Sequence, residues 1–521
     1  MGNNLQNIPY FNKNDNSFQD KSLAEQISDL HTDTGGHNQT PADYFLKENI
    51  NITMKLLNNK IVMDNKNKQI IPGVVSVEAK DFDAEQVKKD KVRYLPLDLI
   101  FVIDTSGSMR GQKIELVKKS ILQVLHFIQG DDRVSLVGFN SQAQVLLELT
   151  QLTKKSQIQI ENQLNELKAD GGTHIGLGMQ KAFDIIKQRK DSKNLACIFL
   201  LSDGQDNSGF PQTQQYMQQS QIKYPFCIDC FGFGDDHDSA TLIKINQLQQ
   251  GTFNFIRDIS QIDDAFTVIL AGIKTFVAQN VKISVNFGNT ELMNGITVSK
   301  TYGSEWIKIQ DNQYEIQLNH LMAGRSKDFV FELQMPQFEM KLSDQQRYQI
   351  IGSAQIKANS LNSSKEQITK KAELMIQLFL NTEVNKKDLE KEEDEKVAIN
   401  HLRVMAGEAM GTVLTQADKN QFENSQSLLS EIINKIKNSK YKNNPTLINL
   451  LKDLDNCQQA AQSNNYSTFG RGYVMNAQQV TIGQQVACNY DYKYANRDYI
   501  LAEQNRGQER FRSINRYYQN K

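Results

Sequence analysis

The sequence has no long hydrophobic run and no excess of charge. No stretch approaches the roughly 20 consecutive apolar residues of a membrane-spanning helix, and the polar N-terminus lacks a signal-peptide core. The 59 basic residues are balanced by 60 acidic ones, which argues against a nucleic-acid-binding protein that depends on bulk positive charge. We therefore expect a cytoplasmic protein with no transmembrane segment and no nucleic-acid partner.

Cysteine is scarce as well. Five cysteines in 521 residues, an odd number without a signal sequence, favour reduced thiols over a disulfide framework. Cys227 and Cys230 form a C-x-x-C pair, but they fall within an apparent strand, where a spacing of three directs side chains to opposite faces. Because no second pair completes a set of four ligands, the pattern does not predict a zinc site.

The most informative stretch begins at Leu97. Its first part, Leu-Asp-Leu-Ile-Phe-Val-Ile, is typical of a strand buried on both faces, and Asp-Thr-Ser-Gly-Ser-Met and a helical pattern follow it. Asp104, Ser106 and Ser108 thus lie at alternate positions of a loop between a strand and a helix. One carboxylate and two hydroxyls make an oxygen-only cluster of the kind that Mg²⁺ binds.

Two further oxygen-bearing residues lie downstream, where the folded chain could return them to this loop. Thr173 follows Asp-Gly-Gly, and Asp203 follows the apolar run Ile-Phe-Leu-Leu-Ser. With Asp104, Ser106 and Ser108, they closely resemble the metal-ion-dependent adhesion site (MIDAS) of von Willebrand factor type A (VWA) domains. That pattern is Asp-x-Ser-x-Ser, a distant Thr and a distant Asp, and all five members occur here in order.

The resemblance implies a role for each of the five residues. Ser106 and Ser108 would bind Mg²⁺ through their hydroxyls, while Asp104 and Asp203 would hold it directly or through water. Thr173 would join or leave the ion with conformational state. Mn²⁺ and Ca²⁺ are alternative ions. Because neutral hydroxyls leave the ion electron-poor, a carboxylate from another protein is a favoured sixth ligand.

Other interpretations of the same residues remain open. Ser106 and Ser108 could cap the following helix while Asp104 fixes the turn, or the site could keep a metal and recruit nothing. A strand followed by Asp also begins Mg²⁺-dependent phosphoaspartate hydrolases. Those enzymes need a second carboxylate two residues on, where this chain has Ser106, and no general base is evident. We therefore expect no enzymatic activity.

Residues 95–276 alternate strand and helix patterns in the manner of a doubly wound, Rossmann-like α/β sheet. The runs 133–139 and 144–149 lie close enough to form a hairpin, which would give the sheet one antiparallel edge strand. Helices are expected at 154–168, 174–189, 212–222 and 259–276. Ligands of such sheets bind beyond the carboxyl ends of the strands, where the five oxygen-bearing residues fall.

Two β segments flank this α/β unit. Residues 46–94 and 277–381 both show the alternation of half-buried strands, and the first has too few strands to be stable alone. We therefore expect one β-sandwich into which the α/β domain is inserted. Two covalent connections would restrict tumbling, and the helix expected at 259–276 could pass a change at the metal site to the sandwich.

The two ends of the chain differ in character. Residues 1–45 are polar and predict a flexible N-terminal arm, with a short helix near 22–30. Residues 382–463 predict a helical module, and residues 464–521 are a tail rich in Gln, Asn, Tyr and Arg. Within the module, helices are expected at 386–415, 419–438 and 445–462.

This order of units resembles a plant family that pairs a VWA domain with a RING ubiquitin ligase module. More distantly, it resembles the heavy chains of inter-alpha-trypsin inhibitor. The Phe-Gly-Arg-Gly-Tyr-Val-Met stretch from Phe469 carries part of the resemblance. No RING zinc ligands occur, so ligase activity is not implied, and the lack of a secretory signal makes a matrix role doubtful.

We expect a metal-dependent protein–protein interaction or scaffold protein, whose Mg²⁺ binds an Asp or Glu of a protein partner. The alternative is an architectural subunit of a larger complex with a structural ion. Two nearby features are expected to be secondary. Asp238 is expected to cap a helix that begins at Ser239; the alternative is that it lies with His237 on the same rim as the ion. Asp206 and Asn207 are expected to lie in a solvated loop; the alternative is that they shape partner choice.

Overall fold

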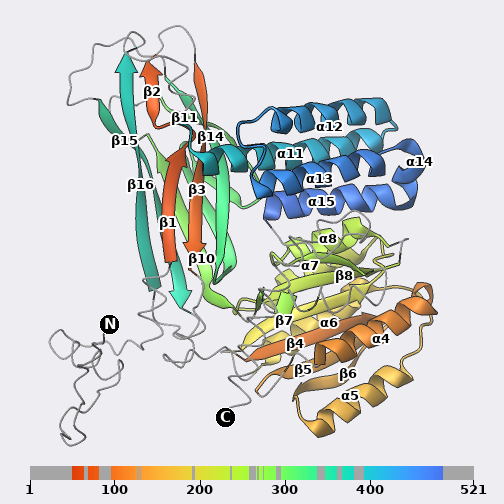
Figure 1. Ribbon diagram of the computed structural model, residues 1–521. Helices are drawn as coiled ribbons and strands as arrows, with labels where there is room; N and C mark the ends of the chain where they lie inside the picture. Colours follow the sequence, from red (N-terminus) through yellow and green to blue (C-terminus); the bar gives the residue numbers. More distant parts are fainter. Residues whose placement is uncertain are drawn as a thin grey trace, which may run out of the picture.

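The computed structural model describes residues 50–484 apart from internal gaps, the longest of which are 81–95, 337–346 and 381–391. The arm expected at 1–45, its helix near 22–30 and residues 485–521 lie outside the described residues. Three units make up the described part: an α/β domain, a β-sandwich and a helical module (Figure 1). Within it, no helix is long and apolar enough to cross a membrane.

The α/β domain is built on a six-stranded sheet with the order β6-β5-β4-β7-β8-β9. Its strands are β4 (Leu97–Asp104), β5 (Arg133–Phe139), β6 (Ala143–Gln151), β7 (Leu195–Ser202), β8 (Cys227–Phe233) and β9 (Phe253–Ile256). All neighbours are parallel except β5 and β6, so the expected antiparallel edge strand is present. The chain order reverses between β4 and β7, which makes that point the expected ligand crevice.

Helices cover both faces of this sheet, which explains why its central strands are apolar throughout. The helices are α4 (Gln112–Leu125), α5 (Lys154–Glu166), α6 (Ile175–Gln188), α7 (Gly209–Ser220) and α8 (Ser239–Gln247). Residues of α4 and α5 enter one apolar cluster, and residues of α6, α7 and α8 pack in another. The helix expected at 259–276 falls mostly outside the described residues. Its expected last residue, Phe276, begins strand β10 instead.

The β-sandwich draws strands from both sides of the α/β domain. Before the domain come β1 (Ile50–Leu56), β2 (Lys60–Met63) and β3 (Gln69–Ala79). After it come β10 (Phe276–Phe287), β11 (Thr297–Thr301), β12 (Trp306–Gln310), β13 (Gln313–Met322), β14 (Arg325–Met335), β15 (Tyr348–Ser360) and β16 (Gln367–Leu380). The two sheets have the orders β1-β3-β14-β11 and β12-β13-β10-β15-β16-β2. Because β3 pairs with β14, and β2 with β16, the α/β domain is inserted into one sandwich, as predicted.

The helical module consists of α11 (Glu395–Ala417), α12 (Phe422–Lys437), α13 (Pro445–Ala460), α14 (Ser463–Asn465), the π-helix η5 (Tyr466–Gly470) and α15 (Arg471–Gly483). The expectation that its first helix begins at residue 386 is wrong, because the Asp394 side chain caps the helix by accepting from the Val397 N–H. The boundary at 463 is wrong too. Val474 and Ala477 of α15 lie in the apolar core of the module, so residues up to Gly483 belong to it.

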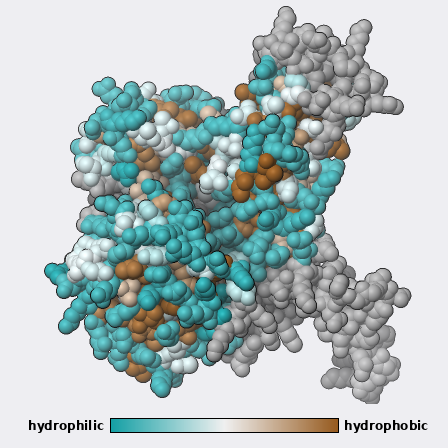
Figure 2. Space-filling model, turned by 180° about the vertical axis from the view of Figure 1, so that it is seen from behind, coloured by the Kyte–Doolittle hydropathy of each residue, from teal (hydrophilic) through white to brown (hydrophobic). Residues whose placement is uncertain are grey.

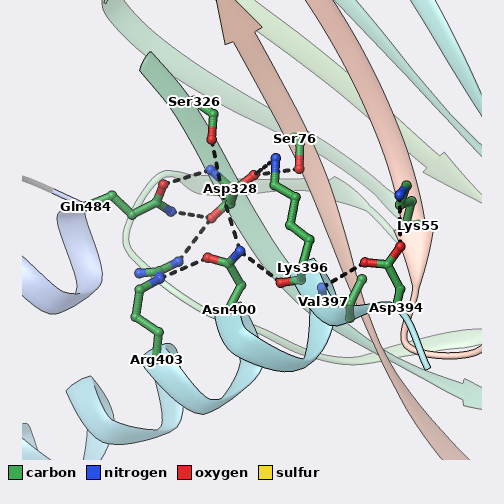
Figure 3. A network of polar contacts seen from close by, with 10 residues as sticks. All are labelled: Lys55, Ser76, Ser326, Asp328, Asp394, Lys396, Val397, Asn400, Arg403 and Gln484. Atoms are coloured by element: carbon green, nitrogen blue, oxygen red, sulfur yellow. Dashed lines mark hydrogen bonds and ion pairs between the residues drawn. The ribbon is translucent and has the colours of Figure 1, made fainter. Parts of the chain in front are cut away.

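Two glutamine side chains attach the other units to the sandwich in the same way. Gln250, just after α8, donates to the Gln317 carbonyl and accepts from the Asn319 N–H, both at 2.8 Å. Gln484, just after α15, accepts from the Asp328 N–H at 2.9 Å and donates to the Asp328 carbonyl (Figure 3). The short edge strand β12 covers only part of β13, and the short edge strand β11 covers only part of β14. Gln250 pairs with backbone groups of β13 beyond the end of β12, and Gln484 does the same on β14 beyond β11. Both side chains thus cover backbone groups that would otherwise form an open sheet edge.

The opposite side of the molecule is mostly hydrophilic, with apolar side chains gathered in small patches between polar ones (Figure 2). On the sandwich, the exposed apolar residues include Ile307 and Ile309 of β12 and Tyr348, Ile350 and Met375 of β15 and β16. Isolated patches of this kind are ordinary on protein surfaces.

Candidate metal site

The Asp-x-Ser-x-Ser loop lies at the carboxyl end of the central strand β4. It continues through the 3-10 helix η1 (Gly107–Met109) into α4. Asp104 and Ser106 are 0% and 1% exposed. The Ser106 N–H donates to Asp104 Oδ1 at 2.9 Å, and the Ser106 and Ser108 hydroxyl oxygens are 3.0 Å apart. The loop therefore turns the three predicted side chains toward one point.

The second aspartate arrives from the neighbouring strand. Asp203 directly follows β7, which runs parallel to β4 with Leu201 paired to Ile103, so the two strands end at the same edge. Asp203 is fully buried, and its negative charge contributes to raising the pKa of Asp104. The Ser202 hydroxyl donates to Asp104 Oδ2 at 2.5 Å. Both predicted carboxylates thus lie in one buried cluster.

The loop that carries Thr173 is bound to the Asp-x-Ser-x-Ser loop through its backbone. The Gly107 N–H donates to the Gly171 carbonyl at 2.9 Å, and the Asp170 N–H donates to the Thr105 carbonyl at 2.7 Å. Thr173 comes two residues after Gly171 and just before α6, and it is half-buried. The structure therefore brings the segments of all five predicted residues to one edge of the sheet.

Arg110 strengthens this connection from the outer side. Its guanidinium donates to the Ala169 carbonyl at 3.0 Å and forms an ion pair with Asp170 at 2.5 Å. This pairing contributes to the low pKa of the Asp170 carboxyl, which the Gly171 N–H lowers most. The contact holds the two loops together without entering the buried cluster.

The electrostatics of the cluster favour a cation. Burial raises the pKa of Asp104 to about 6, although hydrogen bonds from Ser106 and Ser202 oppose the shift. Lys113, from the first turn of α4, places its Nζ 3.0 Å from Asp203 Oδ2. Buried carboxylates beside hydroxyls are hard oxygen donors, and bringing in a divalent cation offsets their cost of burial. The donor set therefore fits Mg²⁺ or a similar ion.

Two acidic residues near the cluster are structural. Asp206 is 9% exposed and its carboxylate accepts from the N–H groups of Ile175 and Ser208, so the expectation of a solvated loop at this residue is wrong. Asp238 caps α8, as predicted, by accepting from the Ala240 and Thr241 N–H groups. Its own N–H donates to the Asp203 carbonyl at 2.7 Å, which fixes the loop before α8 to the segment that carries Asp203.

A second group of candidate ligands was missed by sequence reasoning. The ligand atoms of Cys197, Cys227 and Asp229 lie within 4.8 Å of one another because β7 and β8 pair directly. Cys230 is in the cluster on the other face, as its spacing predicted. Burial raises the pKa of both thiols, and Asp229 already accepts from the Thr252 N–H and hydroxyl. Protonated thiols are poor metal ligands, so this group is better explained as a hydrogen-bonded part of the core.

Comparison with known proteins identifies the class of domain. The family model of the von Willebrand factor type A domain matches residues 99–205. A solved structure, "von Willebrand factor type A from Catenulispora acidiphila", superposes with a TM-score of 0.60 at 15% identity, covering 84% of this chain and 97% of that one. The α/β domain of this chain is therefore a VWA domain, and the sandwich and helices share the fold of that structure.

Two curated relatives match the families that the sequence resembles. "Probable E3 ubiquitin-protein ligase WAVH2" of Arabidopsis thaliana is 23% identical over 299 residues, which are 55% of this chain and 39% of the relative. Inter-alpha-trypsin inhibitor heavy chain H4 of Sus scrofa is 26% identical over 250 residues, 45% of this chain and 26% of the relative. The chain thus spans less than half the length of these relatives.

Proposed function

We propose that this chain is a metal-dependent protein-interaction protein. Asp104, Ser106, Ser108 and Asp203 would hold Mg²⁺, with Thr173 completing the set. When bound, the ion would supply a coordination position for an Asp or Glu carboxylate of a protein partner. The observation that carries the proposal is the pair of fully buried carboxylates beside two hydroxyls at the sheet's reversal point.

The chain's own residues do the organising work in this proposal. The Ser106 N–H orients Asp104 through Oδ1, and Ser202 holds the other carboxylate oxygen. The backbone contacts between the two loops and the Arg110 clamp keep Thr173 at the same edge before any partner arrives. A site held in this way binds with little loss of conformational entropy.

We infer no catalytic step for this chain and propose that it works in the cytoplasm. The position where a phosphoaspartate enzyme needs its second carboxylate is Ser106. The four cysteines that the structure describes are free, which suits a reducing compartment. Neither a nucleic acid nor a membrane is part of the proposal.

A titration of the full chain with Mg²⁺ and Mn²⁺ tests the site. We expect one bound ion by calorimetry and loss of detectable binding in Asp104→Ala and Asp203→Ala, because each removes a carboxylate. Asp311→Ala is the matched control, since Asp311 is 96% exposed and lies on the sandwich. A wild-type chain that shows neither heat nor a thermal shift with divalent ions would refute the metal site.

Capture of partners in Mg²⁺ and in chelator separates the two functional alternatives. A partner bound through the ion should be released by chelation and lost in Asp104→Ala. The alternative, an architectural subunit with a structural ion, draws support from the hydrogen bonds that Gln250 and Gln484 make with the sandwich. Partners that remain bound in chelator would support that alternative.

A further inference from the structure

Lys113 places a positive charge against one of the two buried carboxylates. Its Nζ lies 3.0 Å from Asp203 Oδ2, and its side chain is only 17% exposed. Helix α4 begins at Gln112, so the first turn of the helix projects this ammonium toward the end of β7.

Charge explains why this contact forms. Asp104 and Asp203 are both fully buried, and a buried carboxylate is costly unless a cation or several hydrogen bonds accompany it. Asp104 has hydrogen bonds from Ser106 and Ser202. The ammonium of Lys113 pairs with Asp203 and partly offsets the cost of burying this second carboxylate.

A divalent ion held by Asp203 would share this carboxylate with the Lys113 ammonium. Like charges on one carboxylate repel strongly in a poorly solvated site, so the ion and Lys113 compete for it. The four methylenes of lysine give the ammonium room to withdraw toward solvent.

We propose that Lys113 is a tethered cation that competes with the divalent ion for Asp203. It stabilises the metal-free form and thereby sets the ion concentration at which the site fills. The inference rests on the proposed function, because it needs a metal at this edge. It adds that Lys113 governs how much of the site is occupied at a given ion concentration.

Replacing Lys113 with Met removes the charge and keeps most of the side-chain volume. In the full chain, we expect Lys113→Met to bind Mg²⁺ and Mn²⁺ at least about tenfold more tightly by calorimetry, since repulsion is removed. In chelator, the same variant should unfold at a lower temperature than wild type, because Asp203 loses its partner. Lys113→Arg should keep the weaker, wild-type affinity because it keeps the charge.

Lys118→Met is the matched control. Lys118 lies on the same helix and pairs with Glu115 at 3.0 Å, away from the buried carboxylates. This variant should leave ion affinity and metal-free stability unchanged. If wild type binds the ion and Lys113→Met binds it no more tightly, competition is refuted while the metal site stands. If neither chain binds a divalent ion, the proposed function and this inference both fail.

Discussion

His320 shows how one residue can make stability depend on pH. It lies on β13, where the ring stacks on Phe276 with centroids 4.3 Å apart. Burial lowers its pKa to about 4, because the charged imidazolium would lose its hydration. In the unfolded chain the same group has an ordinary pKa of roughly 6.5. The unfolded state therefore binds more protons between these two values.

The sign of the pH effect follows directly. The contribution of neutral, half-buried His320 to the free energy of unfolding is fully present above roughly pH 6.5 and is lost as the pH falls toward 4. We expect His320→Phe to lose less stability at acid pH than wild type does, by on the order of 2 kcal/mol in the free energy of unfolding. At pH 8 the two proteins should have nearly the same free energy of unfolding. Urea unfolding at pH 4.5 and 8 measures the difference. An equal pH dependence in wild type and variant would contradict the assignment.

The sequence pattern predicted which residues form the candidate site, but not that a lysine pairs with one of its carboxylates. Asp104 and Asp203 could be paired in advance because both follow buried strands, and parallel strands end at one edge of a sheet. The Lys113 contact could not be predicted, because it depends on the phase of α4 and on one side-chain rotamer. The group around Asp229 was missed because strand register brings Cys197 to Cys227, and the sequence does not specify register.

At the scale of elements, α15 is the helix whose role was least evident. Its sequence begins with Arg-Gly and reads like an irregular tail. In the fold, α15 packs closely against α11 at Gly407. A Cβ at this position would lie 2.5 Å from the Ile482 side chain, so only glycine leaves room for the contact. Arg403 of α11 donates to the last carbonyls of α15, at Thr481 and Ile482. These contacts satisfy groups that a helix end otherwise leaves unpaired.

Arg403 therefore joins three elements. It also donates to Asn400 and to the Asp328 carbonyl of β14, and it is 8% exposed (Figure 3). Burial lowers its pKa to about 10, so the guanidinium stays charged at neutral pH. Its positive charge also lies at the negative end of the α15 dipole.

Replacing Arg403 with Met should loosen α15 and the contact of the helical module with the sandwich. We expect a loss of about 3 kcal/mol in the free energy of unfolding, because several buried acceptors lose their donor. Faster amide hydrogen exchange in α15 should accompany it. Lys452→Met, in exposed α13 surface, is the control and should change neither measurement. Unchanged exchange in α15 would show that packing alone holds the helix.

The strands and long helices were more predictable than their ends. Alternation in residues 277–381 predicted a β segment there, although not the short strand β11, and the helices expected at 419–438 and 445–462 correspond to α12 and α13. The start of α11 was missed because the charged run before it has helical composition, whereas the Asp394 cap decides the boundary. Caps and tertiary contacts fix ends more sharply than composition does.

At the scale of the whole molecule, the units are linked at more than one point. Gln250 and Gln484 attach the α/β domain and the helical module to separate edges of the sandwich. The start of α15 also approaches the start of α8, since a Cβ on Gly472 would lie 2.7 Å from the Ser239 hydroxyl. Ser239 follows Asp238, whose N–H donates to Asp203. The helical module thus lies against the loop whose backbone is hydrogen-bonded to Asp203.

The sandwich needs strands from both sides of the inserted VWA domain, so damage to the first strands should unfold the later ones. β3 lies between β1 and β14, with register pairs running from Arg325 with Ala79 to Met335 with Gln69. Val77 of β3 is fully buried in the common core. The VWA domain has its own two apolar clusters, and neither includes a residue of β1 or β3.

Introducing a charge at Val77 should therefore unfold the sandwich selectively. We expect Val77→Asp to cost more than about 3 kcal/mol, because an unpaired carboxylate would enter the core. Glu78→Gln, at the neighbouring exposed position, should be nearly neutral.

Limited proteolysis with mass spectrometry should find cleavage within β14 and β15 in Val77→Asp, while a fragment containing β4 to β9 survives. Loss of that fragment at the same rate would mean that the VWA domain cannot stay folded without the sandwich. Protection of β14 would mean that strands after the insertion hold together without β3.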